Sequence, residues 1–136
     1  MRLRGYRGMI NAGDMDTNLD NEALDRFGEL LVRRVWDPSI WEWTETLHGR
    51  MKGETAEQLR PDLSRLDRRQ ISFIERLLPE IIDTVLHNLL WMLEQEEDVD
   101  ISVQLPNGTV PSLRDVSDGL AGELYDWIPR FSSKRK

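Results

Sequence analysis

One glutamate–histidine pair and one aspartate–histidine pair are the residues of this chain best suited to metal chemistry. Glu45 and His48 are three positions apart, a spacing with which helix bundles hold di-iron centres, but such a centre needs the motif twice and it occurs here once. Asp83 lies one helical turn before His87. Carboxylate oxygens and imidazole nitrogens are both ordinary ligands of divalent metals. The hypothesis is a mononuclear metal site with four ligands: Glu45, His48, Asp83 and His87.

A run of acidic residues follows the longest apolar stretch of the sequence. Within LEQEEDVDIS, positions 93–102, five of seven consecutive positions carry a carboxylate: Glu94, Glu96, Glu97, Asp98 and Asp100. A helix C-terminus has a partial negative charge, so acidic residues there are locally unfavourable. Either these carboxylates are simply solvated, or they form an electronegative surface that binds a basic partner protein. A calcium loop is a poorer explanation, because DVD lacks the continuation of an EF-hand.

Two of the five tryptophans receive different predictions although they lie two positions apart. Trp43 shares a helix face with Ile40 and is expected in the core. Trp41 shares a line with Glu45 and His48, away from that face. A tryptophan rimmed by polar groups is typical of an interface anchor, and the alternative is that the N-terminal arm covers it.

A second stripe on the longest expected helix raises a related question. Phe73, His87 and Trp91 lie roughly opposite the main apolar face of that helix. Either the helix is packed on both sides within the chain, or this stripe meets another chain, as in a homodimer.

Composition and charge exclude several classes of function. The 136 residues contain no cysteine, which rules out disulfides, thiolate metal sites and cysteine nucleophiles. There is no G-x-S-x-G elbow, phosphate loop or dinucleotide fingerprint, so we interpret the chain as a non-enzyme and expect no cofactor. Seven of the 18 basic residues lie near the ends, which leaves 11 basic against 25 acidic residues in positions 14–128. A body of this charge repels nucleic acids and anionic membranes and attracts basic proteins.

Targeting signals are also missing from the sequence. No apolar run reaches the length of about 18 residues that a membrane span needs. The N-terminal stretch MRLRGYRGMINAG is basic but lacks the apolar region of a secretory signal. We therefore expect a cytoplasmic protein, whose natural start is Met1, Met9 or Met15.

Two helices are expected in the first third of the chain. The first covers positions 18–36, with Asn18 or Asp20 as its cap. Asp37-Pro38 predicts the start of a second helix, because proline is favoured at the first helical position. Gly49 ends that helix, assisted by a further glycine at position 53.

The third expected helix is the longest. Positions 54–66 form a connection with one helical turn at most, broken at Pro61. The sequence Asp67-Arg-Arg-Gln70 is typical of a capping box and opens a helix over positions 68–96, kinked at Pro79. Its main apolar face is expected in the core and consists of Ile71, Ile74, Leu78, Ile81, Ile82, Val85, Leu86, Leu89, Met92 and Leu93.

The periodicity then changes from helix to strand. Apolar and polar residues alternate over positions 101–105, and Asn107-Gly108 is the strongest two-residue signal for a hairpin. A return strand is expected from Thr109, then a short helix over positions 117–125 and a last strand over positions 127–131.

These elements predict an α+β fold, mostly helical, with three helices and a small antiparallel sheet of two or three strands. The chain length suits a single globular domain, which we place at positions 18–132. A flexible N-terminal arm at positions 1–17 and a basic tail at positions 133–136 flank it.

The acidic body and the segments TVLHNLLWMLEQ and SDGLAGELYDWIPRFS resemble small bacterial proteins of the immunity and antitoxin type. This resemblance implies a non-enzymatic protein that binds a basic partner. No residue role is carried over from it. The expected binding residues come from the patterns above: Trp41, Glu45, His48, Glu94, Glu96, Glu97, Asp98 and Asp100.

Overall fold

The computed structural model describes the backbone of residues 12–133 and the side chains of residues 17–133. Most of these residues are helical and one two-stranded antiparallel sheet is present, which confirms the α+β class. The expected N-terminal arm and basic tail lie largely outside the described residues. Within them, no helix combines the length and the apolar character needed to cross a bilayer.

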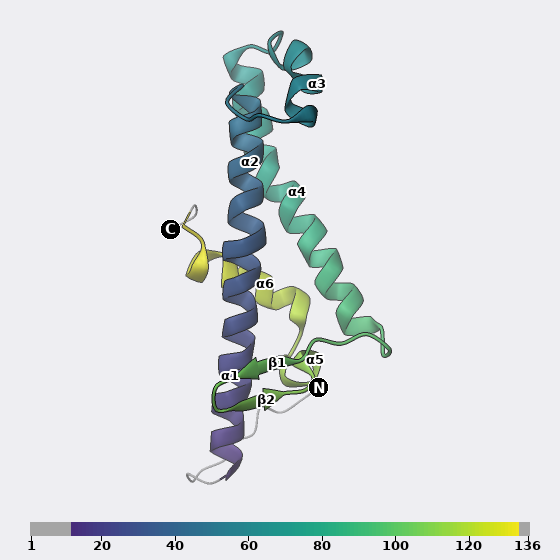
Figure 1. Cartoon of the computed structure of the whole chain (residues 1–136). Coiled ribbons are helices and arrows are strands. Elements are labelled where there is room, and N and C mark those ends of the chain that lie inside the picture. The colour runs from purple at the N-terminus through teal and green to yellow at the C-terminus, as the bar shows by residue number, and fades with distance from the viewer. Residues whose placement is uncertain (1–11, 134–136) are drawn as a thin grey trace.

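A single helical rod replaces the two N-terminal helices that the sequence predicted (Figure 1). It comprises α1 (Ala12–Leu31), the π-helical turn η1 (Val32–Trp36) and α2 (Asp37–Leu47) without interruption. Asp37-Pro38 does mark the start of α2, with Pro38 in its first turn, but the separation from the preceding helix that the sequence predicted is absent. In η1 the Asp37 amide bonds to the Val32 carbonyl, five residues earlier. A wider turn of this kind accommodates the missing N–H of the next residue, Pro38, inside a continuing helix.

The chain returns through two more helices. Gly49, at φ 74°, helps to end the rod as predicted. The expected connection is instead the ten-residue helix α3 (Glu54–Leu63), in which Pro61 lies in the last turn and removes a single hydrogen bond. The long helix α4 (Arg68–Gln95) begins at the predicted capping box, in which the side chains of Asp67 and Gln70 each bond to the other residue's amide.

The C-terminal segment forms the sheet and two short helices. Strands β1 (Val103–Leu105) and β2 (Gly108–Val110) pair antiparallel around the predicted turn. Helices α5 (Leu113–Val116) and α6 (Leu120–Phe131) follow. The predicted last strand at positions 127–131 is wrong, because its apolar residues continue the helical spacing of Leu120 and Leu124. If α1, η1 and α2 are counted as one, the described residues form five helices, not the three expected.

The main core lies at one end of the molecule. The rod and α4 lie close together at the tip that carries α3 and diverge toward the sheet, where α6 lies between them (Figure 1). Trp127 of α6 is fully buried and its ring packs edge-on against Phe27. The buried cluster consists of Ala23, Leu24, Leu31, Val32, Trp36, Leu86, Leu90, Leu93, Val110, Leu113, Leu120, Ala121, Leu124, Trp127 and Ile128.

This distribution divides the described side chains into two regions. We call residues 17–37 and 83–133 the body, and residues 38–82 the arm. All 15 members of the buried cluster belong to the body. Only three apolar residues of the arm are buried: Leu47, Ala56 and Leu78. The arm is therefore a helical projection with a small core of its own.

Candidate protein-binding surface

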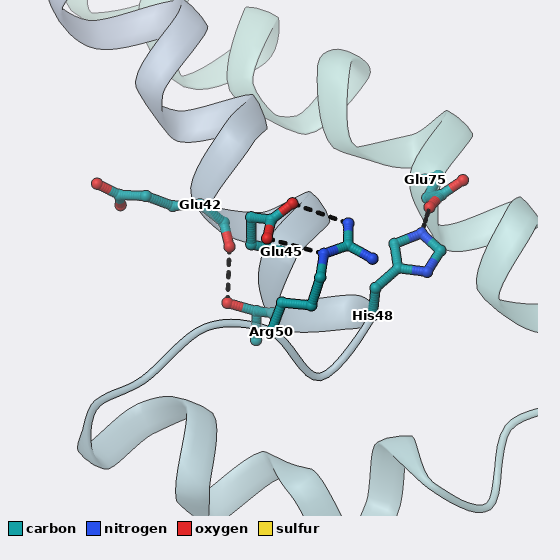
Figure 2. Close-up of polar contacts among 6 residues, drawn as sticks. Glu42, Glu45, His48, Arg50 and Glu75 are labelled. Atoms are coloured by element: carbon teal, nitrogen blue, oxygen red, sulfur yellow. Dashed lines mark hydrogen bonds and ion pairs between the residues drawn. The ribbon is translucent and has the colours of Figure 1, made fainter.

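The two residues of the predicted Glu-x-x-His pair bind different partners in the arm. Figure 2 shows Glu45 facing Arg50, whose guanidinium donates two hydrogen bonds of 2.8 Å to the Glu45 carboxylate. The bond to Glu45 raises the pKa of Arg50 above its ordinary value. The His48 ring instead contacts the carboxylate of Glu75 on α4. These contacts join α2 to the following loop and to α4.

The two remaining metal candidates also have separate roles. Asp83 is buried and accepts a hydrogen bond of 2.6 Å from the Trp36 indole Nε1. The Nδ1 atom of His87 lies 3.2 Å from the Tyr125 hydroxyl. No group of three or more histidine, aspartate or glutamate side chains among the described residues is placed to hold a metal ion. The structure thus does not assemble the four-ligand site.

The acidic run divides into structural and solvent-facing residues. The Glu94 carboxylate accepts a hydrogen bond of 2.5 Å from the Ala121 amide in the first turn of α6. Desolvation by itself raises the pKa of Asp100. Hydrogen bonds from Ser112 and Ile101 and the charge of Arg114 outweigh this effect, so the pKa of Asp100 is lower than its ordinary value. Both residues hold the C-terminal segment in place and are not free for a partner.

Arg114 explains how α4 can end without a basic residue of its own. From α5, this side chain reaches the C-terminal end of α4 and donates to the carbonyl oxygens of Leu93, Val99 and Glu96. A cation at this position compensates the negative end of the helix. The favourable charge is therefore supplied by tertiary structure.

Three members of the acidic run face solvent: Glu96, Glu97 and Asp98. Within the described part of the chain, their side chains make no hydrogen bond or ion pair. They form what we call the acidic triad, directly after the last turn of α4.

The tryptophans of α2 both face solvent. Trp41 is 50% exposed, in line with the first of the two alternatives that the sequence left open. Trp43, predicted to be core, is 41% exposed. Both line an open cavity of about 400 Å³ together with Met51 and Ala56. The core prediction for Trp43 is wrong because the arm has no third long helix to cover that side of α2.

Helix α4 carries the largest exposed apolar surface among the described residues. Val85 is 61% and Ile81 55% exposed, and neighbouring side chains on the same half of the helix are also exposed. The set, which we call the α4 face, consists of Phe73, Leu77, Ile81, Val85, Leu89, Trp91 and Met92. Ile81, Val85, Leu89 and Met92 were predicted as core, and their exposure contradicts that prediction. Phe73 and Trp91 were predicted either to pack within the chain or to meet another chain, and their exposure contradicts the first alternative. Two other residues of the predicted core face, Leu86 and Leu93, are buried as expected and contact the core together with Leu90.

No member of the α4 face is charged, although the guanidinium of Arg76 lies 5.6 Å from the centroid of the Phe73 ring at its edge. At 100° per residue, the half of α4 that includes it spans about 160° of the helix circumference. From Gln70 to Gln95, the only polar residues on this half are Gln70, Thr84, Asn88 and Gln95. A helix side that remains in water normally carries charges.

The area of the α4 face is large for a monomer. With ordinary side-chain areas, such as about 150–250 Å² for an aromatic residue, the exposed fractions amount to roughly 600 Å². The largest apolar patch on a typical monomer is about 300–600 Å², and larger patches mark interaction sites. Area, lack of charge and the adjoining acidic triad together make this surface the best candidate for function.

The sequence contained a signal for this surface, but helical periodicity alone does not distinguish an exposed apolar side of a helix from a buried one. The apolar positions of α4 extend over more than half of its circumference, wider than one packed face requires. Which part of that wide face is covered depends on where α6 and α2 cross α4.

Comparisons of the chain with protein-family models, with curated proteins and with solved structures give no match.

Proposed function

We propose that this chain is a non-enzymatic protein-binding module whose interface is the α4 face together with the acidic triad. The observation that carries the proposal is the charge-free, exposed apolar face of α4. Removing roughly 600 Å² of apolar surface from water is favourable by the hydrophobic effect. A partner would bring an apolar surface for the face and basic residues for the triad.

The two parts of the interface would have different tasks. Phe73 and Trp91 are large aromatic anchors of the type that supplies most of the affinity in protein interfaces. The carboxylates of the triad would accelerate association and select a basic partner. The resemblance to immunity and antitoxin proteins supports the same kind of role, that of a protein that works by binding.

Trp41 belongs to a less favoured part of the surface. It lies on α2, and Glu45 and His48 beside it are already engaged by Arg50 and Glu75. We assign Glu45 and His48 to the stability of the arm and leave Trp41 outside the proposed interface.

Site-specific photo-crosslinking tests the proposal. A photo-reactive amino acid is incorporated at Val85, in cells that naturally express the chain, and irradiation should convert a large share of it into covalent adducts with protein. The matched control is the same amino acid at Gln58, an exposed position on α3 away from the α4 face. Neutralising the triad (Glu96→Gln, Glu97→Gln, Asp98→Asn) should lower the adduct yield, because the charge that attracts the partner is lost. Equal or absent adducts at the two positions would refute the proposed function.

A further inference from the structure

We infer that the partner of the α4 face is a second copy of this chain, bound antiparallel through α4. The inference rests on the proposed function and names the partner for the same surface. Three independent features of α4 support it: the symmetry of its apolar residues, the opposite charges at its two ends, and the area of the face.

The apolar residues of the α4 face are arranged symmetrically about the level of Asp83. Ile81 and Val85 lie two positions on either side, and Leu77 and Leu89 six positions. Met92 lies nine positions after Asp83, and the partly buried Ile74, on the same half of α4, lies nine positions before it. A two-fold axis at that level, perpendicular to the helix, would place each residue at the same height as its counterpart on the second copy. The matched stretch from 74 to 92 is about 27 Å long at 1.5 Å per residue.

The aromatic residues at the edge of the face obey the same symmetry. Phe73 and Trp91 lie on the same line of α4, ten positions before and eight positions after Asp83. The two-fold operation brings Phe73 of one copy to within about two residues, roughly 3 Å along the helix axis, of the level of Trp91 on the other. Aromatic pairs of this kind stabilise interfaces beyond their buried area.

The charges at the ends of α4 are complementary under the same operation. Arg68 and Arg69 are exposed in the first turn and make no ion pair among the described residues. Counting from Asp83, they are equivalent to positions 98 and 97, which are Asp98 and Glu97 of the acidic triad. An antiparallel pair therefore brings the basic start of each α4 to the same level as the acidic end of the other. A parallel pair would bring like charges together.

The area is sufficient for a small specific dimer. Two copies of the α4 face would bury roughly 1,200 Å², the lower end of the range for specific interfaces. At 100° per residue, Arg68 and Arg69 lie outside the half of α4 that forms the face, and the acidic triad follows the last turn of the helix. These charges therefore favour the antiparallel orientation by attraction at a distance and do not add to the buried area. This arrangement also gives the acidic triad a role at a helix end where it is locally unfavourable.

Sedimentation equilibrium of the purified full chain tests the dimer. The wild type should sediment as a dimer at tens of micromolar, and Val85→Glu should weaken association roughly 100-fold or more, because it would bury an unpaired carboxylate at the centre of the interface. The matched control is Val35→Glu, which introduces the same charge at an exposed valine of η1 and should leave the dimer intact. A wild-type monomer at these concentrations, or a dimer that is insensitive to Val85→Glu, overturns the inference.

Charge reversal tests the antiparallel orientation. Arg68→Glu with Arg69→Glu, or Glu97→Lys with Asp98→Lys, should each weaken the dimer at least about tenfold. The four substitutions combined in one chain should restore it, since each end then meets the opposite charge again. A failure to restore association overturns the orientation.

Disulfide formation gives a test that does not depend on destabilising the interface. The chain has no cysteine, so Thr84→Cys can oxidise only with a second copy. Position 84 lies one residue from the axis, and the two introduced thiols should join rapidly on mild oxidation. Thr55→Cys, at an exposed threonine of α3, is the control and should join slowly. Equal rates overturn the inference.

The crosslinking experiment separates failure of the dimer from failure of the proposed function. Adducts from Val85 that contain only peptides of this chain support the dimer. Adducts with a different protein, together with a monomeric purified chain, overturn the dimer and leave the protein-binding role standing.

Discussion

The body and the arm are both rich in large apolar residues, yet they bury them to very different extents. In the body, α1, α4, α6 and the sheet converge, so that a side chain such as Trp127 is enclosed from several directions. The arm consists of two long helices with α3 at the tip, and Ala56 is the one buried residue of α3. Two helices share only one interface, so their outer faces remain in water. The α4 face continues from the arm into the body, where Val85, Leu89, Trp91 and Met92 remain exposed on the side of α4 that is turned away from the core. None of its members belongs to the buried cluster, so the face is not part of the internal core.

Two buried carboxylates mark the boundary between these regions. Asp83 binds Trp36, and Asp37 accepts hydrogen bonds of 2.6 Å from the Ser132 hydroxyl and 3.0 Å from the Ser133 amide. Buried carboxylates are tolerated when donors satisfy them. These hydrogen bonds connect the rod to α4 and to the C-terminal residues at the point where the core ends and the arm begins.

The largest expected effect comes from truncating equivalent tryptophans in the two regions. Trp127→Ala removes a fully buried side chain from the body and should lower the free energy of unfolding by about 3–5 kcal/mol. Trp43→Ala removes a half-exposed side chain from the arm and should cost less than about 1.5 kcal/mol. Chemical denaturation of both variants measures the contrast. Similar losses would mean that the arm contributes to a common core.

Local signals in the sequence predicted local structure well. The capping box at Asp67 and Gln70 and the hairpin at Asn107-Gly108 depend only on residues a few positions apart, and both were found. The rod was missed because the π-helical turn before Pro38, at Val32–Trp36, leaves no separate signal in the sequence. Exposure of Trp43 could not be predicted, because helix periodicity identifies an apolar face but not whether another element covers it.

The candidate site shows the same limit. The acidic run was identified as unusual, but its division into structural and free residues depends on contacts of Glu94 with α6 and of Asp100 with Arg114, which are distant in sequence. The α4 face was predicted as two stripes, one in the core and one that either packs within the chain or meets another chain. The positions of α6 and α2 against α4 decide which side is covered.

Smaller effects on stability, opposite in sign to each other, are expected at two glycines of the body. A Cβ atom at Gly28 would lie 2.4 Å from ring atoms of Trp127, so Gly28→Ala should cost about 1–3 kcal/mol through overpacking. A Cβ atom at Gly122 meets nothing within 4 Å, and Gly122→Ala in α6 should gain about 0.5–1 kcal/mol from helix propensity. Thermal unfolding of the pair measures both. A neutral Gly28→Ala would show that Trp127 can move and that the body is less tightly packed than the structure indicates.

The smallest expected effect concerns the acidic run, where the body ends and the proposed interface begins. Neutralising the triad (Glu96→Gln, Glu97→Gln, Asp98→Asn) removes unfavourable charges from the end of α4. At concentrations too low for association, the change should raise the free energy of unfolding by about 1 kcal/mol. The same variant should associate more weakly and with less dependence on salt, because the attraction to the basic start of the second copy's α4 is lost.

Asp100→Asn is the control for that variant and should behave in the opposite way. The pKa of Asp100 is lower in the folded chain than its ordinary value of 3.8, so its charge stabilises the fold above that pH and this contribution is lost as the pH falls through the folded value. Asp100→Asn should therefore reduce stability at neutral pH, and its difference from the wild type should shrink under acid. Urea denaturation at two pH values measures this. If the triad variant instead lost stability as Asp100→Asn does, the triad would be a structural part of the body, and the gain in stability combined with weaker binding would not be observed.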